Sequence, residues 1–569
     1  MRRLIFSFLF AAVALTTAAN SQTRPDFNRR QTFDALNYEI HVKFNRSAKQ
    51  VIGDTRVTLT PLRPGFRSFE LDAVGLKFSG VYLGDSDTKL KYTAGPQKVV
   101  ISLDKAYVPG DVIKVRFVYT ATAPKKGVYF VDALETDSKL KHDAQIWTQG
   151  EADESRHWFP NFDFPSDKAT TEEFITAKKG ETVIGNGILI GKDNTADGEV
   201  EWHYKMPIPH STYLVSFVIG NYAKVEDNFG SIPLAFYTYP GTERIAKRAY
   251  RDTAKMIGVY EELTGVKFPY NKYDQTIVAN FQFGGMENIT ATTMADTEIL
   301  ATRLDDEGGA GSFRDFGMGD PTDLVSHELA HSWFGDLVTC KNWAELWLNE
   351  SFATYMEAAY REKVFGHEGY IRKLKLDAFQ FRIDDVSTRR RHGLFNQRAG
   401  DIAKLFDVSA VTYNKGSVVL HMLREQVGDA AFWKAVNSYL NDHKFGNVES
   451  GDLRSAMEKA SGQDLKWFFD QWVYGTGQPM IKVDRVYSAA AKKLTVTVTQ
   501  TQSPLKATPA VYKFPLEIAI TADGKVRIEK LDVTKKIQAF QFSDVGTDPK
   551  VQIDPYDKQI LVWSIEKAA

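Results

Sequence analysis

Two histidines and two glutamates in the stretch from Val325 to Glu350 have the types and spacing of a metal-dependent hydrolytic centre. His327 and His331 are four residues apart, so on a helix both side chains project from one face. Two imidazoles on one face can hold a zinc ion, and Glu328, one step round the helix, can then reach a water molecule beside that ion. The pattern HELAH alone is expected by chance about once in a hundred such sequences.

A third ligand makes coincidence a much weaker explanation. A catalytic zinc ion takes three protein ligands, and Glu350 follows His331 after 18 intervening residues, in a segment with a helical pattern. Two helices joined by a loop of this length can pack face to face. The sequence therefore predicts one zinc ion per chain, held by His327, His331 and Glu350, with Glu328 as the general base.

Three further segments accompany this motif. They read FGGMENITATT from Phe283, TQGEADESRHWFPNFDFP from Thr148, and VTYNKG from Val411. Taken alone, the first segment would be interpreted as a turn, and Glu151 in the second as a solvated loop carboxylate. Tyr413 in the third would be interpreted as a packing residue at the start of a helix. Taken with the histidine motif and in this order, all four segments resemble the aminopeptidase N type of zinc peptidases (gluzincins), a family that includes the leukotriene hydrolase branch.

This resemblance implies roles for residues outside the metal motif. It implies that Glu287 and Glu151 bind the free α-ammonium group of a peptide and that Tyr413 donates a hydrogen bond to the developing oxyanion. It also implies that the backbone at Gly284 and Gly285 pairs with the peptide, while Met286 and Gln149 line the pocket. The chain departs from the family pattern at Ser351, Ala152 and Asn161, where the family usually has glycine, proline and often cysteine.

Alternation of apolar and polar residues changes along the chain and predicts its division into domains. A length of 569 residues favours about two to four domains. Two-residue alternation predicts an N-terminal all-β domain over residues 22–226, and helical periods predict a catalytic domain over residues 227–478. Alternation then returns and predicts a β-sandwich over residues 479–569. We therefore expect a multidomain α+β protein. The resemblance implies that its catalytic domain is thermolysin-like and that the chain is similar to bacterial secreted members of the family that lack a helical C-terminal domain.

The N-terminus and the composition bear on localisation and partners. Residues 1–21 combine two arginines, a short apolar run and small residues, which is the layout of a signal peptide; a membrane anchor is the weaker alternative. We therefore expect export to the periplasm or the extracellular space, without stable membrane insertion after cleavage. The formal net charge of −1 gives no indication of a nucleic-acid partner, and we expect none. The only cysteine, Cys340, permits no internal disulfide and is expected to be a buried packing residue.

The sequence thus predicts a zinc aminopeptidase that hydrolyses N-terminal residues from peptides by metal-activated water. Its expected partners are peptides with a free N-terminus. A zinc endopeptidase, an epoxide hydrolase on the same scaffold and a non-catalytic binding module remain alternatives. The Gly-rich loop over residues 305–323 is interpreted either as a lid over the site or as a mobile surface connection.

Overall fold

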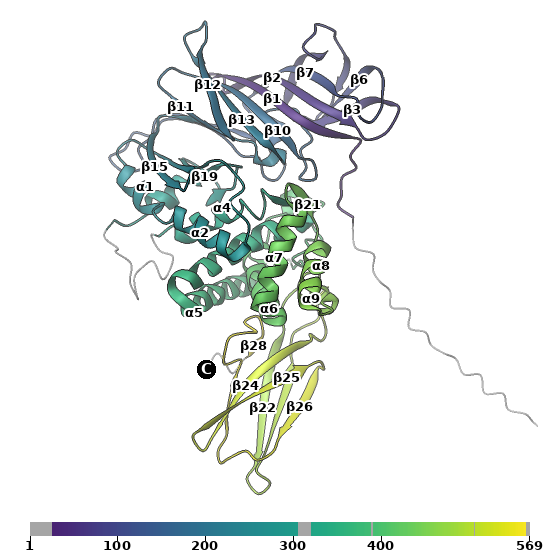
Figure 1. Ribbon diagram of the computed structural model, residues 1–569, viewed down its shortest axis with the longest axis vertical. Coiled ribbons are helices and arrows are strands. Elements are labelled where there is room, and N and C mark those ends of the chain that lie inside the picture. Colours follow the sequence, from purple (N-terminus) through teal and green to yellow (C-terminus); the bar gives the residue numbers. More distant parts are fainter. Residues whose placement is uncertain (1–25, 305–319, 389–390, 506, 565–569) are drawn as a thin grey trace, which may run out of the picture.

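A computed structural model describes residues 26–304, 320–388, 391–505 and 507–564. The predicted signal peptide and residues 305–319 of the predicted lid or surface loop lie outside the described residues. N-terminal sheets, a mixed helical region and a set of C-terminal strands follow one another along the longest axis of the molecule (Figure 1). The predicted multidomain α+β fold is confirmed. Within the described ranges, no helix is long and apolar enough to span a membrane.

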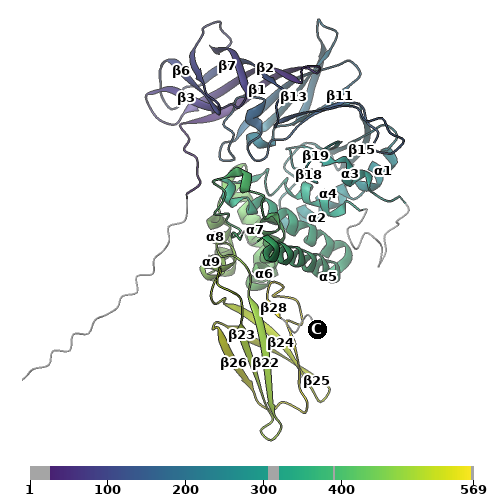
Figure 2. The same ribbon diagram turned by 180° about the vertical axis from the view of Figure 1, so that it is seen from behind.

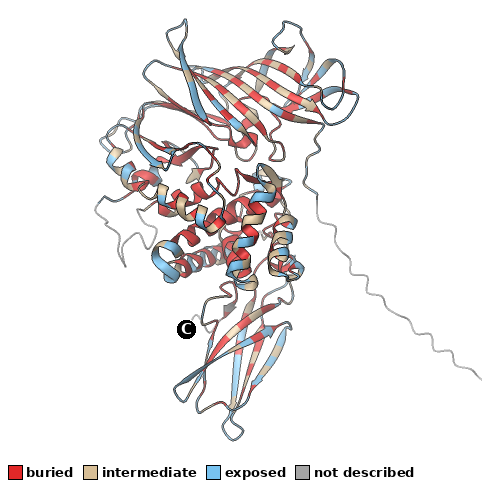
Figure 3. Cartoon of the chain, in the orientation of Figure 1, coloured by how far each residue is buried: buried red, intermediate tan, exposed pale blue. Residues whose placement is uncertain are grey.

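Strands of the N-terminal region form three sheets. The largest has seven strands in the order β12-β13-β10-β1-β2-β7-β4, with β1 parallel to β10 and antiparallel to β2. Its strands are β1 (Phe33–Asn45), β2 (Gln50–Pro61), β4 (Leu76–Leu83), β7 (Ile113–Thr122), β10 (Ala169–Ala177), β12 (Ile188–Asn194) and β13 (Val200–His210). The smaller sheets comprise β3 (Phe66–Asp72), β5 (Lys91–Ala94) and β6 (Lys98–Tyr107), and β8 (Val128–Val131), β9 (Gln145–Thr148), β11 (Thr182–Gly185) and β14 (Phe217–Gly220). Buried residues alternate with more exposed ones along β2 and β7, as the sequence pattern predicts (Figure 3).

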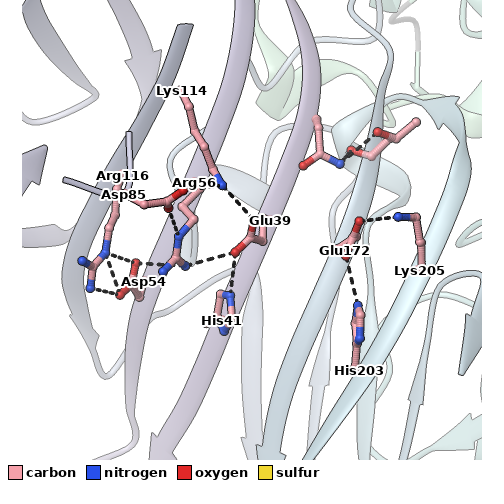
Figure 4. Close-up of polar contacts among 12 residues, drawn as sticks. Glu39, His41, Asp54, Arg56, Asp85, Lys114, Arg116, Glu172, His203 and Lys205 are labelled. Carbon is pink, nitrogen blue, oxygen red and sulfur yellow. Dashed lines mark hydrogen bonds and ion pairs between the residues drawn. The ribbon is translucent and has the colours of Figure 1, made fainter. Parts of the chain in front are cut away.

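The more exposed face of the large sheet carries paired charges of opposite sign. Arg116 on β7 donates hydrogen bonds to both carboxylate oxygens of Asp54 on β2, the shortest 2.6 Å long, and Glu172 on β10 accepts from Lys205 and His203 on β13 (Figure 4). Such cross-strand pairs are worth about 0.2–1 kcal/mol each. These charged side chains lie on the face of the sheet that contacts solvent, and the side chains of the opposite face pack into the core.

The middle region combines a mixed sheet with helices. The sheet has five strands in the order β15-β16-β17-β19-β18: β15 (Ala223–Phe229), β16 (Ile232–Thr238), β17 (Tyr273–Val278), β18 (Gly285–Met286) and β19 (Ala291–Ala295). The helices are α1 (Glu243–Ala249), α2 (Thr253–Thr264), α3 (Asp296–Leu300), α4 (Thr322–Ala330), α5 (Trp347–Thr388), α6 (Gly416–Val427), α7 (Asp429–His443), α8 (Ser450–Ser461) and α9 (Lys466–Trp472). A short π-helical turn, η6 (Val411–Lys415), precedes α6, and β20 (Val338–Cys340) pairs with β21 (Gly446–Val448), burying Cys340.

Helix α5 contains a break at Gly366, where the backbone adopts φ 72°. Residues other than glycine rarely adopt such a positive φ. The break divides α5 into a first segment, which carries Glu350, and a second segment that ends at Thr388.

The C-terminal strands form two sheets. One has the order β26-β23-β22-β28 and the other the order β25-β24-β27. Their bounds are β22 (Met480–Ser488), β23 (Lys493–Gln500), β24 (Phe514–Ala522), β25 (Lys525–Val533), β26 (Ile537–Phe542), β27 (Lys550–Ile553) and β28 (Trp563–Ser564). On β23, Leu494, Val496 and Val498 are fully buried while the threonines between them are only half-buried. This is the alternation expected of a strand with one face in a core.

A turn of the N-terminal region anchors the loop that follows β18. Asn186, fully buried, donates hydrogen bonds to the carbonyl oxygens of Leu214 (3.2 Å) and Ile289 (2.7 Å) and accepts one from the Ser216 amide (2.6 Å). The next residue, Gly187, donates its amide to Thr290 Oγ1 at 2.7 Å. One side chain thus joins two N-terminal backbone segments to the loop that carries Glu287.

We predict that Asn186→Ala lowers the free energy of unfolding by about 2–4 kcal/mol, because it leaves buried backbone groups without partners. Thermal and denaturant unfolding measure this loss. Asn441→Ala, at an exposed position of α7, serves as the control and should change stability by less than about 0.5 kcal/mol. Equal stability of the two variants would contradict the anchoring role of Asn186.

Candidate active site

Helices α4 and α5 bring the three predicted metal ligands together. His327 lies in the last turn of α4, His331 directly follows that helix, and Glu350 lies in the first turn of α5. The two Nε2 atoms are 3.1 Å apart, and Glu350 Oε2 is 3.2 Å from His327 Nε2 and 3.3 Å from His331 Nε2. A four-coordinate metal ion about 2.1 Å from each ligand places its ligand atoms about 3.4 Å apart. The spacing of the three side chains therefore fits such an ion.

Hydrogen bonds on the far side of each imidazole fix the ligand atoms. His327 Nδ1 donates to Glu357 Oε1 at 2.8 Å, and His331 Nδ1 donates to the Phe334 carbonyl oxygen at 2.8 Å. In the neutral imidazole, each Nε2 therefore carries a lone pair that faces the other one and Glu350.

Positive charge is required where these atoms converge. Burial lowers the pKa of His327, but Glu350 and Glu357 outweigh it and raise that pKa to about 9. Burial acts to raise the pKa of Glu350, but His331 and His327 outweigh burial and lower that pKa to about 2. A metal cation supplies the same positive charge through the lone pairs, so the donor set fits a bound divalent ion.

A cavity of about 550 Å³ opens onto this cluster. Glu328 lines it, and its Oε2 atom is buried with no hydrogen-bond partner among the described residues. Burial raises the pKa of this carboxyl group to about 8, although His327 and His331 oppose the shift. An unpartnered carboxylate with a raised pKa inside a cavity is suited to take up a proton.

Strand β18 forms one wall of the cavity and lies beside α4 (Figure 2). Gly284, Gly285 and Met286 all line the cavity. A Cβ atom at Gly285 would lie 2.3 Å from Glu328 Oε1, so the glycine leaves the space in which that carboxylate lies. The three residues that the resemblance assigns to peptide backbone and side-chain binding thus lie where they can contact a ligand.

Two carboxylates from different regions meet next to the metal cluster. Glu151, from the N-terminal region, and Glu287, from the loop after β18, each have a carboxylate oxygen within 4.8 Å of one on Glu350. Burial raises the pKa of both, and the negative charge of Glu287 raises that of Glu151 further. Gln149 lies beside them and donates to Met286 Sδ at 3.3 Å. The negative charge of these neighbouring carboxylates favours a cationic ligand.

Tyr413 also lines the cavity, and it lies in the π-helical turn η6. Its ring lies nearly parallel to that of His327, at 16° and with 5.8 Å between the ring centroids. Burial raises the pKa of its hydroxyl group well above the ordinary value, with Glu350 adding to the shift. The group therefore stays protonated and can donate a hydrogen bond.

Sequence reasoning did not identify several side chains that support the cluster. Tyr213 OH donates to Glu287 Oε1 at 3.3 Å and accepts from Asn349 Nδ2 at 3.3 Å, which links Glu287 to the helix of Glu350. Glu357, the acceptor for His327, lies seven residues after Glu350 on α5. That spacing of two helical turns was a detectable signal, whereas nothing near Tyr213 in the sequence indicates its contact.

Family models match two stretches of the chain. A model described as "Peptidase M1 N-terminal domain" matches residues 34–214, and one described as "Peptidase family M1 domain" matches residues 248–472. The second stretch contains the three candidate metal ligands, His327, His331 and Glu350.

Several curated proteins are similar to the chain. Aminopeptidase 2 of Candida albicans is 30% identical over 412 residues, which are 72% of this chain and 43% of that protein. Aminopeptidase N of Streptomyces lividans is 34% identical over 375 residues, or 62% of this chain and 40% of that protein. The chain spans about half the length of the curated relatives that it matches.

A solved structure shares the fold. The crystal structure of Legionella pneumophila aminopeptidase A in complex with aspartic acid superposes with a TM-score of 0.77, at 18% sequence identity. The match covers 94% of this chain and 60% of that one.

We predict that a divalent metal ion added to chelator-treated protein raises the midpoint of thermal unfolding. At a free concentration about 100 times Kd the stabilisation is about 2.7 kcal/mol. Glu350→Ala should abolish the metal-dependent shift, because it removes one of three ligands. Glu345→Gln alters a buried glutamate outside the cluster and should keep the shift. A shift of normal size in Glu350→Ala would contradict the ligand assignment.

Proposed function

The chain belongs to peptidase family M1, and we propose that it is a zinc-dependent aminopeptidase that removes residues from the free N-terminus of peptides. The observation that carries the proposal is the position of Glu151 and Glu287, whose carboxylate oxygens lie within 4.8 Å of one on Glu350. Carboxylates at this place hold the α-ammonium group of a peptide beside the metal centre. The bond exposed to hydrolysis is then the first peptide bond.

The comparisons support this reading. The matched relatives include proteins named aminopeptidase, and the Legionella protein was crystallised with aspartic acid. An amino acid of that kind carries the same α-ammonium group that Glu151 and Glu287 bind in our proposal. The sequence of residues 1–21 supports the further proposal that the protein acts outside the cytoplasm.

In the proposed reaction, His327, His331 and Glu350 hold the zinc ion. When bound, zinc supplies Lewis-acid chemistry: it polarises the scissile carbonyl and makes a nearby water molecule more acidic. Glu328 accepts the proton of the attacking water at its carboxylate. It then transfers that proton to the nitrogen of the leaving amine.

Two sets of residues orient the substrate. Glu287 and Glu151 accept hydrogen bonds from the α-ammonium group, and Tyr213 holds the Glu287 carboxylate in place at 3.3 Å. Tyr413 donates a hydrogen bond to the oxyanion that forms from the scissile carbonyl. Positioning of this kind lowers the barrier because the donors are oriented before the charge develops.

We predict that Glu328→Gln lowers kcat by about 10²- to 10⁴-fold while zinc binding is retained, because the amide cannot accept the proton. Steady-state kinetics on an aminoacyl-amide, together with the zinc content of the purified protein, measure the two effects. Turnover near the wild-type rate would contradict the assignment of Glu328 as the general base.

We predict that Glu287→Ala lowers kcat/KM for free-amine aminoacyl-amides by about 100-fold, which corresponds to about 2.7 kcal/mol of lost charge-assisted bonding. The panel should include the same substrates with an acetylated N-terminus, before and after chelation. The wild-type protein should not cleave the acetylated substrates, because they carry no ammonium group. Cleavage of acetylated peptides by the wild-type protein would instead support an endopeptidase.

A further inference from the structure

Three buried charged side chains, Glu357, Lys373 and Asp377, form a row that starts at the Nδ1 atom of His327. The proposed reaction does not use them. Lys373 is the central member of the row, at 8% exposure. Its ammonium group lies 3.0 Å from Glu357 Oε2 and donates to Asp377 Oδ1 at 2.7 Å. Both carboxylates are buried as well. Burying a cation between two carboxylates costs desolvation, which their close geometry and further hydrogen bonds must offset.

The two ends of this row reach the two sides of the active site. At one end, Glu357 Oε1 accepts the hydrogen bond from Nδ1 of the candidate metal ligand His327. At the other end, Asp377 Oδ1 accepts from Asn414 Nδ2 at 2.9 Å, and Asp377 Oδ2 accepts from Ser417 Oγ at 3.0 Å. Asn414 directly follows Tyr413 in the π-helical turn.

Lys373 reaches Glu357 only because α5 folds back at Gly366. Glu357 and Lys373 are 16 residues apart in the sequence, and a straight helix would separate them by about 24 Å. Their charged atoms are nevertheless 3.0 Å apart. The break therefore positions the ammonium group against the helix segment that carries the metal ligand.

The ammonium group of Lys373 is held in its charged form. Burial lowers the pKa of Lys373, but Asp377 and Glu357 outweigh burial and raise that pKa above its ordinary value. Without this cation, the two buried carboxylates would lie close together with uncompensated negative charge, and their mutual repulsion would favour movement of one of them.

A second contact ties the same turn to the same helix independently. Ser351, fully buried and next to Glu350, donates its hydroxyl to the Thr412 carbonyl oxygen at 2.5 Å. Gly416 leaves the room for it, since a Cβ atom there would lie 1.7 Å from Ser351 Oγ. The departure from the usual glycine at Ser351 thus adds a bond to the turn that carries Tyr413.

We infer that Lys373 is a positioning residue that couples the metal ligand His327, through Glu357, to the turn that carries Tyr413, through Asp377 and Asn414. The inference rests on the proposed function, because it assigns Lys373 to the geometry of that reaction. It adds that one buried cation, Lys373, fixes the position of His327 relative to that of Tyr413. π-Helical turns are frequent at functional sites, and this one is tied to α5 through Asn414 and the Thr412 carbonyl oxygen.

The experiment compares Lys373→Met with Lys272→Met. Lys272 is also 8% exposed, and its ammonium group donates to Asp274 at 2.7 Å and to the Gly185 carbonyl oxygen at 2.8 Å. It lines a different groove and has no bond to His327, His331 or Glu350. Four quantities are measured for each variant: zinc affinity by competition with a chelator, the midpoint of thermal unfolding, hydrogen exchange of the amides of residues 411–415, and kcat and KM at saturating zinc.

For Lys373→Met we expect zinc affinity to fall by about 10- to 100-fold and exchange at residues 411–415 to become faster. At saturating zinc, kcat should fall by about 10-fold or more. This loss should be smaller than the 10²- to 10³-fold loss expected when an oxyanion donor is removed completely. KM should stay within about twofold, since no bond to substrate is removed. Lys272→Met should lower only the midpoint of unfolding.

Two partial variants separate the ends of the row and remain informative if Lys373→Met does not fold. Glu357→Gln should weaken zinc binding, and Asn414→Ala should lower kcat and speed exchange at residues 411–415 without changing zinc affinity. Wild-type zinc affinity in Glu357→Gln or wild-type kcat in Asn414→Ala overturns the inference. So does a Lys373→Met variant that matches Lys272→Met, or one that raises KM alone, which would make Lys373 a substrate-binding residue that lines the cavity.

Failure of the proposed function gives a different result. If the wild-type protein does not hydrolyse aminoacyl-amides, the aminopeptidase proposal fails. Zinc affinity and hydrogen exchange still report on the coupling, because neither measurement depends on turnover.

Discussion

The convergence of His327, His331 and Glu350 is the constraint on which the rest of the site depends. Three buried ligand atoms lie within 3.3 Å of one another, and this arrangement favours positive charge, which a bound cation would supply. Each imidazole is also held from behind, by Glu357 and by the Phe334 carbonyl. A bound metal ion would offset the cost of collecting these groups, so the packing of α4 against α5 would be linked to the affinity for that ion.

The acidic character of the cavity follows from the same arrangement. Glu151, Glu287 and Glu328 lie close to Glu350, and burial raises the pKa of all three. Their combined charge disfavours anions and favours a ligand that brings its own positive charge. A metal ion and an α-ammonium group together meet this requirement, which is why the proposed substrate and the proposed cofactor stabilise the same cavity.

Contacts between the N-terminal and catalytic regions hold the two halves of the cavity in register. Asn186 bonds backbone groups on both sides, and Tyr213 connects Glu287 to Asn349 on α5. These contacts involve buried polar atoms with defined partners, so a small displacement leaves several of them unpaired. The candidate amine site is therefore anchored by defined contacts, although it is built from separate parts of the chain.

Local patterns in the sequence determined much of this protein. The four-residue spacing of His327 and His331 specifies one helix face, and strand alternation such as that of Leu494, Val496 and Val498 specifies one buried sheet face, because both follow from backbone geometry alone. Glu151, Glu287 and Tyr413 came from a resemblance between segments, since nothing in their immediate neighbours distinguishes them from ordinary loop and helix residues.

Tertiary structure alone decided the contacts that support these residues. Asn186 meets Ile289 across 103 residues, and Lys373 meets Glu357 only because the helix reverses at Gly366. Such contacts depend on how elements pack, and packing is set by many weak interactions that no short stretch of sequence contains. The sequence therefore specified which groups can do the chemistry, and the fold decided which buried side chains hold them in place.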